Sequence, residues 1–239
     1  MFKLLRPKAT LFSASVLVVS LAGSIAYPLA GSAQGVTYQP PTRGAPTGSA
    51  RVGGGTRGPD GKLTSLNVLA PDHVGLTATD QPALYWFTSN PLDAPVELTL
   101  LGEGGLKPAL ELALSPPIEA GIHKLELAKH GVRLEPGVPY QWFVAVVVDA
   151  TQRSGDIVAG GEVQRMAPPP DMVKELERSG AAGAAAVYAR AGYWYDALEA
   201  LSARVDGAPG DPEPRAQRAA LLEQAGLVEA ASYERGAKR

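Results

Sequence analysis

Three consecutive prolines and an aspartate at positions 168–171 divide the chain into two parts with different hydrophobic periodicity. Before this run, short apolar stretches alternate with turns rich in Pro, Gly and Asp. After it, apolar residues recur three and four positions apart. Because a proline run cannot continue a strand ladder, the sequence predicts strands before it and helices after it, which makes the fold class α+β.

The apolar stretches before the prolines predict a series of short strands. Alternation of period two is clearest over 96–101 and 109–114. Short strands separated by turn residues are typical of a β-sandwich, which we place over residues 58–167. The expected strands are Leu66–Leu69, Val74–Thr79, Ala83–Thr88, Val96–Leu101, Ala109–Leu114, Ile122–Leu127, Tyr140–Asp149 and Ile157–Gln164.

A corner before the strand over 140–149 resembles the one that precedes a late strand in fibronectin type III domains. Pro136 and Gly137 make the turn, and Leu134 packs beneath it. The Tyr140 hydroxyl is expected to bond a backbone group a few residues upstream while its ring joins the core with Trp142. The corner indicates an immunoglobulin- or fibronectin III-like sandwich.

Residues 168–239 predict a helical segment. Asp171 is expected to cap a helix over 172–179 that Gly180 ends, and Asp211 to cap a helix that runs to Ala225. Further helices are expected over 181–191 and 193–205. Within the latter, an apolar stripe predicted to be buried consists of Trp194, Ala197, Leu198, Leu201 and Val205.

A repeat of thirty-four residues links these helices. Ala191-Gly192 recurs at Ala225-Gly226, and Ala197 recurs at Ala231. This period is typical of tetratricopeptide helix pairs. The alternative is an alanine-rich hairpin that meets the spacing by chance. So few helices cannot bury their own apolar face, so we expect them to pack on the sandwich.

One face of the strand over 140–149 offers Phe143, Ala145 and Val147, which is too apolar for a solvated sheet face. We expect the C-terminal helices to cover this face. If they do not, it is a partner-binding surface.

The N-terminus predicts an export signal. Basic residues precede an apolar run over 11–21, and small residues follow up to Ala33, after which cleavage is expected. Residues 1–33 are thus a signal peptide, which places the protein in the periplasm or outside the cell with no stable membrane span. An uncleaved anchor is the alternative. Residues 34–57, which lack apolar periodicity, are expected to form a flexible linker.

Charge and residue counts exclude several classes of function. Without Lys3, Arg6 and Lys8 the chain has 22 − 3 = 19 basic and 24 acidic residues, a net charge of −5, so no nucleic-acid partner is expected. The absence of cysteine excludes disulfides and thiolate sites. The three histidines form no metal-binding motif, and we expect no metal and no cofactor.

One polar cluster carries candidate chemistry: Asp149, Arg153, Asp156 and Glu162. Paired carboxyl groups beside an arginine suit acid–base catalysis in a hydrolase. In the structural interpretation, Arg153 forks onto Asp149 or Asp156 and fixes a hairpin. Tyr193 and Tyr195 flank the apolar stripe and are expected at the surface, where they are candidates for binding a sugar or peptide.

Several motifs together resemble the bacterial family called domain of unknown function 928. The resemblance spans about residues 51 to 227 and implies an exported protein of two-part layout without assigned activity. The motifs are Gly-Gly-Gly-Thr-Arg-Gly at 53–58, Gly75-Leu76-Thr77, Tyr85-Trp86-Phe87, Tyr140-Gln141-Trp142, Arg153-Ser154-x-Asp156 and Trp194-Tyr195-Asp196-Ala197-Leu198.

From these observations we expect a non-enzymatic protein that works as an interaction or scaffold module and whose partner is another envelope protein. The alternatives are a carboxylate-dependent hydrolase of the envelope and a carbohydrate or peptide binder.

Overall fold

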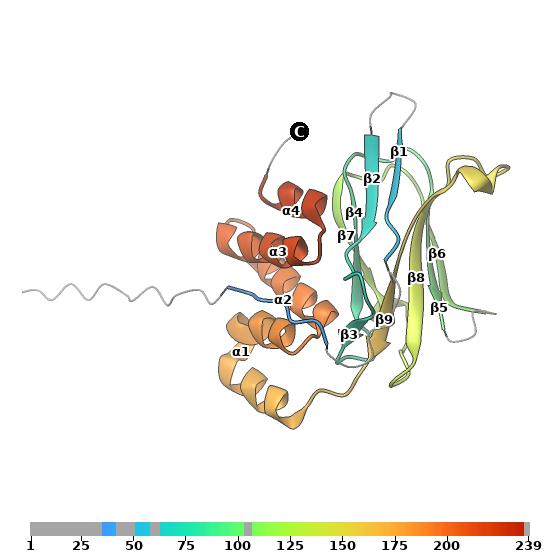
Figure 1. Cartoon of the computed structure of the whole chain (residues 1–239). Coiled ribbons are helices and arrows are strands. Elements are labelled where there is room, and N and C mark those ends of the chain that lie inside the picture. Colours follow the sequence, from blue (N-terminus) through green and yellow to red (C-terminus); the bar gives the residue numbers. More distant parts are fainter. Residues whose placement is uncertain (1–34, 42–50, 58–62, 103–106, 237–239) are drawn as a thin grey trace, which may run out of the picture. The chain divides into compact units, whose positions relative to one another are not determined.

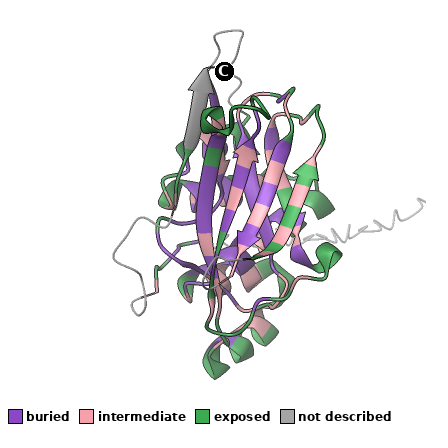
Figure 2. Cartoon of the chain, turned by 90° about the vertical axis from the view of Figure 1, so that its right-hand side faces the viewer, coloured by how far each residue is buried: buried purple, intermediate pink, exposed green. Residues whose placement is uncertain are grey.

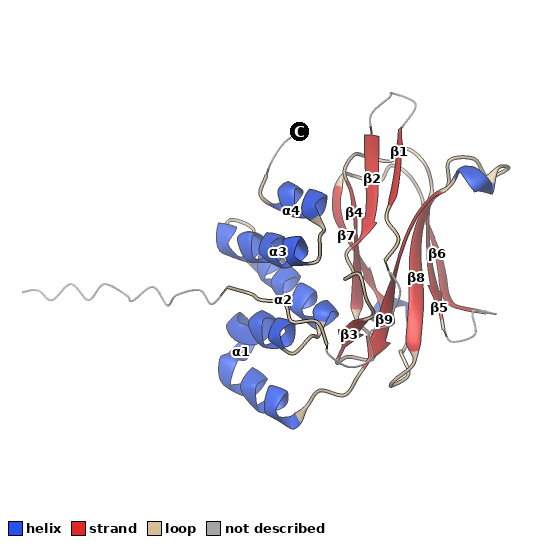
Figure 3. Cartoon of the chain, in the orientation of Figure 1, coloured by secondary structure: helices blue, strands red, loops and turns tan. Residues whose placement is uncertain are grey.

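Strands and helices separate at the proline run, as the sequence predicts. The computed structural model of the chain describes residues 35–41, 51–57, 63–102 and 107–236. In it, the last strand ends at Arg165 and the first helix begins at Pro170 (Figures 1 and 3). The predicted signal peptide, its cleavage after Ala33 and its alternative as an anchor lie outside the described residues.

The strands form two sheets. The first has the order β1-β2-β4-β7 and is antiparallel throughout. The second has the order β3-β9-β8-β5-β6, in which only the β3–β9 pair is parallel. The strands are β1 (Gly54–Arg57), β2 (Leu63–Val68), β3 (Gly75–Thr77), β4 (Ala83–Thr88), β5 (Val96–Leu101), β6 (Pro108–Leu114), β7 (Gly121–Glu126), β8 (Pro139–Val146) and β9 (Ile157–Arg165).

The main hydrophobic core extends from the two sheets into the helices, and along the strands it follows the alternation of the sequence. In β5, Val96, Leu98 and Leu100 are buried, whereas the residues between them are partly exposed. Figure 2, which shows the side of β5, β6 and β8, displays this alternation along the strands. Two short 3₁₀ helices, Leu127–His130 and Arg153–Gly155, lie in the connections.

The predicted corner before β8 is confirmed. Gly137 has φ +78°, a conformation that favours glycine, and Leu134 is buried. The Glu135 N–H donates to the Tyr140 hydroxyl at 3.3 Å, and the rings of Tyr140 and Trp142 are buried. The corner fixes the point at which the chain enters β8.

Four helices follow in the described part of the chain: α1 (Pro170–Arg190), α2 (Trp194–Gly207), α3 (Pro212–Gln224) and α4 (Val228–Glu234). Gly180, with φ 57°, interrupts α1 at the predicted break. Asp211 caps α3 as predicted, since its Oδ1 accepts from the Glu213 N–H at 2.9 Å. The cap predicted at Asp171 is wrong: Pro170 starts α1, and Asp171 lies in the first turn without a capping hydrogen bond.

The helices dock on the sheets, but not on the predicted face. They lie against β4 and β7 of the first sheet and β3 of the second, and every residue of β4 is buried (Figure 1). Phe143 and Ala145 of the second sheet remain partly exposed, while Val147 is buried. The Phe143 ring packs on Gly160 of β9, where a Cβ would come within 2.6 Å of it. The ring thus covers part of the neighbouring strand.

The flexible linker predicted for residues 34–57 is wrong in the described parts. Val36 and Tyr38 are buried, and residues 54–57 form β1. Short-range periodicity could not indicate this, because the contacts of residues 35–41 come from the C-terminal helices and from His73. No helix in the described ranges combines the length and apolarity needed to cross a membrane.

Candidate functional site

A cavity of about 300 Å³ lies between α2 and the first sheet. Its size is at the lower end of small-molecule sites. The walls come from the segment after β3, from β7 and from the facing surfaces of α1 and α2. Polar groups in the lining are Thr77, Thr79, Gln81, Lys124, Glu126, Tyr188, Tyr195, Asp196 and Glu199.

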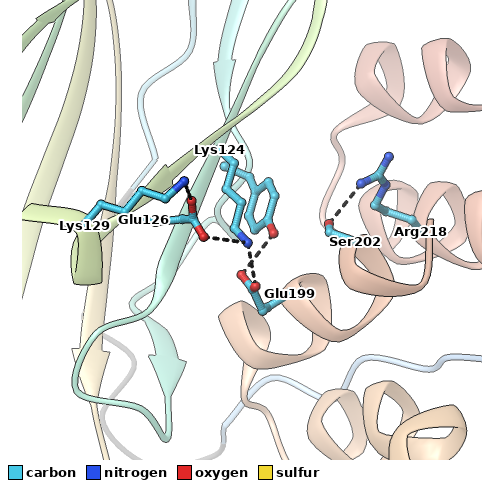
Figure 4. A network of polar contacts seen from close by, with 7 residues as sticks. Lys124, Glu126, Lys129, Glu199, Ser202 and Arg218 are labelled. Atoms are coloured by element: carbon cyan, nitrogen blue, oxygen red, sulfur yellow. Dashed lines mark hydrogen bonds and ion pairs between the residues drawn. The ribbon is translucent and has the colours of Figure 1, made fainter. Parts of the chain in front are cut away.

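An ion-pair network forms one wall. Lys124 Nζ lies 2.8 Å from Glu199 Oε1 and 3.4 Å from Glu126 Oε1 (Figure 4). Lys129 pairs with the other oxygen of Glu126, and the Tyr85 hydroxyl donates to Glu199 Oε2 at 3.0 Å. The network joins β7 to α2. Its three central side chains, Lys124, Glu126 and Glu199, are each about one-third exposed.

The electrostatics of this wall keep Lys124 charged. Burial alone would lower the pKa of its ammonium, but the hydrogen bond to Glu199 and the surrounding negative groups raise the pKa above its ordinary value. The contact with Lys129 lowers the pKa of Glu126. Lys124 therefore acts as a cation near neutral pH and not as a nucleophile, which would need the neutral amine.

Asp196 lies deeper, in the first turn of α2. It is only 9% exposed, and its Oδ2 accepts from the Ala78 N–H just after β3 at 3.0 Å. Burial raises its pKa to about 7, although the hydrogen bonds from Ala78 and Thr77 oppose the shift. Asp196 therefore changes its protonation state close to neutral pH.

The cavity lining carries three carboxyl groups, those of Glu126, Asp196 and Glu199. The ammonium groups of Lys124, in the lining, and of Lys129, outside it, pair with Glu199 and Glu126. With Asp196 ionised, one negative charge in the cavity is left uncompensated. A cationic group of a ligand would compensate this charge. Its N–H groups would donate hydrogen bonds to the carboxylate oxygens. The pKa of Asp196 suits proton transfer at neutral pH.

The predicted polar cluster does not assemble into one site. Arg153 Nε donates to Asp156 Oδ2 at 2.6 Å, and its Nη2 donates to Glu97 Oε2 at 2.5 Å. Asp149 instead accepts from the Thr151 N–H at 2.8 Å, a bond that helps to lower its pKa, and Glu162 accepts from Gln141 at 3.1 Å. The structure thus favours the structural interpretation of Arg153, with Glu97 as the partner that sequence analysis missed.

The predicted exposure of the two tyrosines is wrong. Tyr193 is 4% and Tyr195 1% exposed. The Tyr195 hydroxyl accepts from Trp142 Nε1 and donates to the Glu162 carbonyl, both at 2.9 Å, and the Tyr193 hydroxyl donates to the Ala167 carbonyl. These tyrosines join α2 to the second sheet, so neither offers a free ring face to a ligand.

The cavity residues were missed because their polar pattern is ordinary in sequence. Lys124 and Glu126 alternate on a strand, and Asp196 and Glu199 are three apart on a helix, which is also the pattern of solvated faces. Thr77, Tyr195 and Asp196 do belong to motifs named in the sequence analysis, but those motifs carried the family resemblance and did not indicate a cavity. The pairing of β7 with α2 is a tertiary property that these spacings do not encode.

Two of the three histidines contact aromatic side chains. The Tyr38 hydroxyl lies 2.9 Å from His73 Nε2, and His123 stacks on Trp86. Across the described ranges, no group of three or more His, Asp or Glu side chains is arranged to hold a metal ion.

A family model described as Domain of Unknown Function (DUF928) matches residues 52–234. The match covers the strands and helices described above, including the cavity residues. A search of curated proteins finds none that matches the chain.

Proposed function

The chain belongs to the family of domain of unknown function 928, and from this premise we propose that it is a non-enzymatic protein-interaction module of the bacterial envelope. The main supporting observation is the charge of the cavity, whose three carboxyl groups outnumber the paired ammonium groups of Lys124 and Lys129 by one. A lysine or arginine side chain of a partner protein suits this composition and the cavity volume of about 300 Å³.

Two finer assignments are part of this proposal. The corner at Tyr140 supports an immunoglobulin- or fibronectin III-like sandwich. The starts of α2 and α4, Trp194 and Val228, stand thirty-four positions apart, as do the turn glycines Gly192 and Gly226, which supports tetratricopeptide-like helix pairs. Export rests on the basic and apolar pattern of residues 1–33.

Photo-crosslinking in cells tests the interaction proposal. A photoreactive amino acid replaces Ala128, which lines the cavity, or the control residue Ala113, which is exposed on β6. We expect one discrete cross-linked partner from position 128 and none from position 113. Glu199→Gln should remove that product, because it removes a negative charge from the cavity. A product that survives Glu199→Gln, or that forms equally from position 113, contradicts the proposal.

One observation favours a second candidate, a carboxylate-dependent hydrolase. Asp196 has a pKa of about 7 at the cavity and lies one helical turn from Glu199, an arrangement that suits general acid–base catalysis. If the purified chain cleaves peptidoglycan fragments and Asp196→Asn abolishes cleavage without loss of folding, this candidate replaces the first. If the chain leaves these fragments intact, peptidoglycan is not its substrate and the interaction proposal is retained.

A further inference from the structure

Residues 35–41, here called the strap, lie against the helices as an extended peptide would. The strap forms neither helix nor strand, yet Val36 is 5% and Tyr38 9% exposed (Figure 1, blue). Its contacts come from residues more than thirty positions away in sequence. The strap site consists of His73, Ala189, Gly192, Trp194 and Gln224.

The backbone of the strap is recognised by groups that do not depend on its sequence. Gln224 Oε1 accepts from the Tyr38 N–H, and Gln224 Nε2 donates to the Val36 carbonyl, both at 2.8 Å. The Gln39 N–H donates to the Ala189 carbonyl at 3.0 Å. The side-chain amide of Gln224 thus bonds the N–H of one residue and the carbonyl of the residue two positions before it, as a neighbouring strand would in a sheet.

The side chains of the strap are recognised separately. The Tyr38 ring meets Trp194 edge to face, with centroids 5.0 Å apart, and its hydroxyl lies 2.9 Å from His73 Nε2. Gly192 makes room for the main chain, because a Cβ there would lie 3.1 Å from the Gln39 carbonyl oxygen. The site therefore selects a tyrosine two positions after a small apolar residue in an extended segment.

We propose that the strap site is a binding site for extended peptides of this kind and that residues 35–41 occupy it as an intramolecular ligand. Main-chain bonds from a side-chain amide and a pocket for one aromatic residue are the elements of peptide recognition in general. The covalent connection gives the strap an effective concentration on the order of millimolar, so it excludes weaker peptides in trans. Once the strap is cut from the rest of the chain, a separate peptide that makes the same contacts can replace it.

Cutting the full chain in place tests this proposal. A recognition sequence for a site-specific protease is introduced between Pro41 and Arg51, and the purified chain is cut. A fluorescent synthetic peptide with the sequence of residues 34–44 is then added, and its uptake is followed by anisotropy. We expect the cut chain to exchange its strap for the labelled peptide, and the uncut chain to take up about 100-fold less at the same concentration.

Two substitutions make the result specific. Gln224→Ala in the cut chain should weaken peptide binding about tenfold, because two hydrogen bonds are lost. Gln152→Ala, at an exposed glutamine in the loop after β8, should leave binding unchanged. A labelled peptide in which alanine replaces the residue corresponding to Tyr38 should not be taken up by the cut chain.

The proposal is overturned if the cut chain keeps its melting temperature but takes up no peptide, or takes up a scrambled peptide equally well. It is also overturned if cutting unfolds the chain, since the strap would then be an integral part of the fold and not a ligand. The cross-linking result at the acidic cavity is independent of these outcomes, because the two sites share none of these residues.

Discussion

The carboxyl group of Asp196 shows how one residue links the fold to pH. Its pKa of about 7 in the folded chain, raised by burial, exceeds the value of about 3.9 for an unfolded aspartate. The folded state therefore binds this proton more tightly than the unfolded state. The resulting stability is fully present below about pH 4 and is lost as the pH rises through about 7.

We predict that Asp196→Asn flattens this dependence. The amide oxygen can still accept from the Ala78 N–H, while the cost of a buried charge disappears. At pH 8 the variant should be more stable than the unaltered chain, by about 1–4 kcal/mol, and at pH 4 the two should be close. Urea unfolding at both pH values measures the difference. Asp206→Asn, at an exposed position of α2, is the control and should leave the stability unchanged at both pH values. If Asp196→Asn is less stable than the unaltered chain at pH 8, the argument is refuted.

Among single residues, sequence analysis identified the core members but not the site. Trp142, Trp194 and Ala197 were predictable because strand alternation and helical spacing place them on buried faces. Tyr193 and Tyr195 were misplaced because spacing alone assigns them to the flanks of the stripe. The first turn of α2 is in fact enclosed by the sheets and the strap, so every side of it is buried.

At the scale of elements, the turns that end α1 and α3 allow a matched comparison. Gly192 and Gly226 follow these helices with φ +83° and +71°, which alanine adopts at a cost of about 1–2 kcal/mol. We predict that Gly226→Ala lowers the free energy of unfolding by about this amount. Gly192→Ala should cost about 1–3 kcal/mol more, because its Cβ would press on the strap at the Gln39 carbonyl.

Thermal unfolding of the two variants measures this difference. Equal losses of stability would show that the strap yields without cost at Gly192 and would contradict the close contact described for that turn. A larger loss for Gly192→Ala would agree with a strap that is packed into place.

Elements whose signals are local were predicted well, and elements held by distant partners were not. β4 and β5 have the expected bounds because a continuous apolar run marks the first and alternation of period two marks the second, each within six residues. β1 is rich in glycine and the strap lacks periodicity, so neither has a local signature. The face on which the helices dock is set by contacts between distant segments, such as those of α2 with β3 and β4, which spacing within any one strand does not reveal.

For the molecule as a whole, polar contacts fasten the helices to both sheets and to one another. Trp194 Nε1 donates to the Leu69 carbonyl at 2.8 Å, and Trp142 Nε1 donates to the Tyr195 hydroxyl. A buried ion pair joins Arg218 of α3 to Glu234 of α4 at 2.7 Å. Arg218 also donates to the Ser202 hydroxyl of α2 at 3.0 Å (Figure 4). Breaking such contacts leaves buried polar groups unpaired, which opposes separation of the parts.

The central claim is that strands and helices form one cooperative body, since the acidic cavity needs residues from both parts. Scanning calorimetry of the chain from Gln34 onward tests it directly. We predict a single transition whose calorimetric and van't Hoff enthalpies agree, and which shifts as a whole with Trp194→Ala. Two separate transitions, of which Trp194→Ala shifts only one, would contradict the claim.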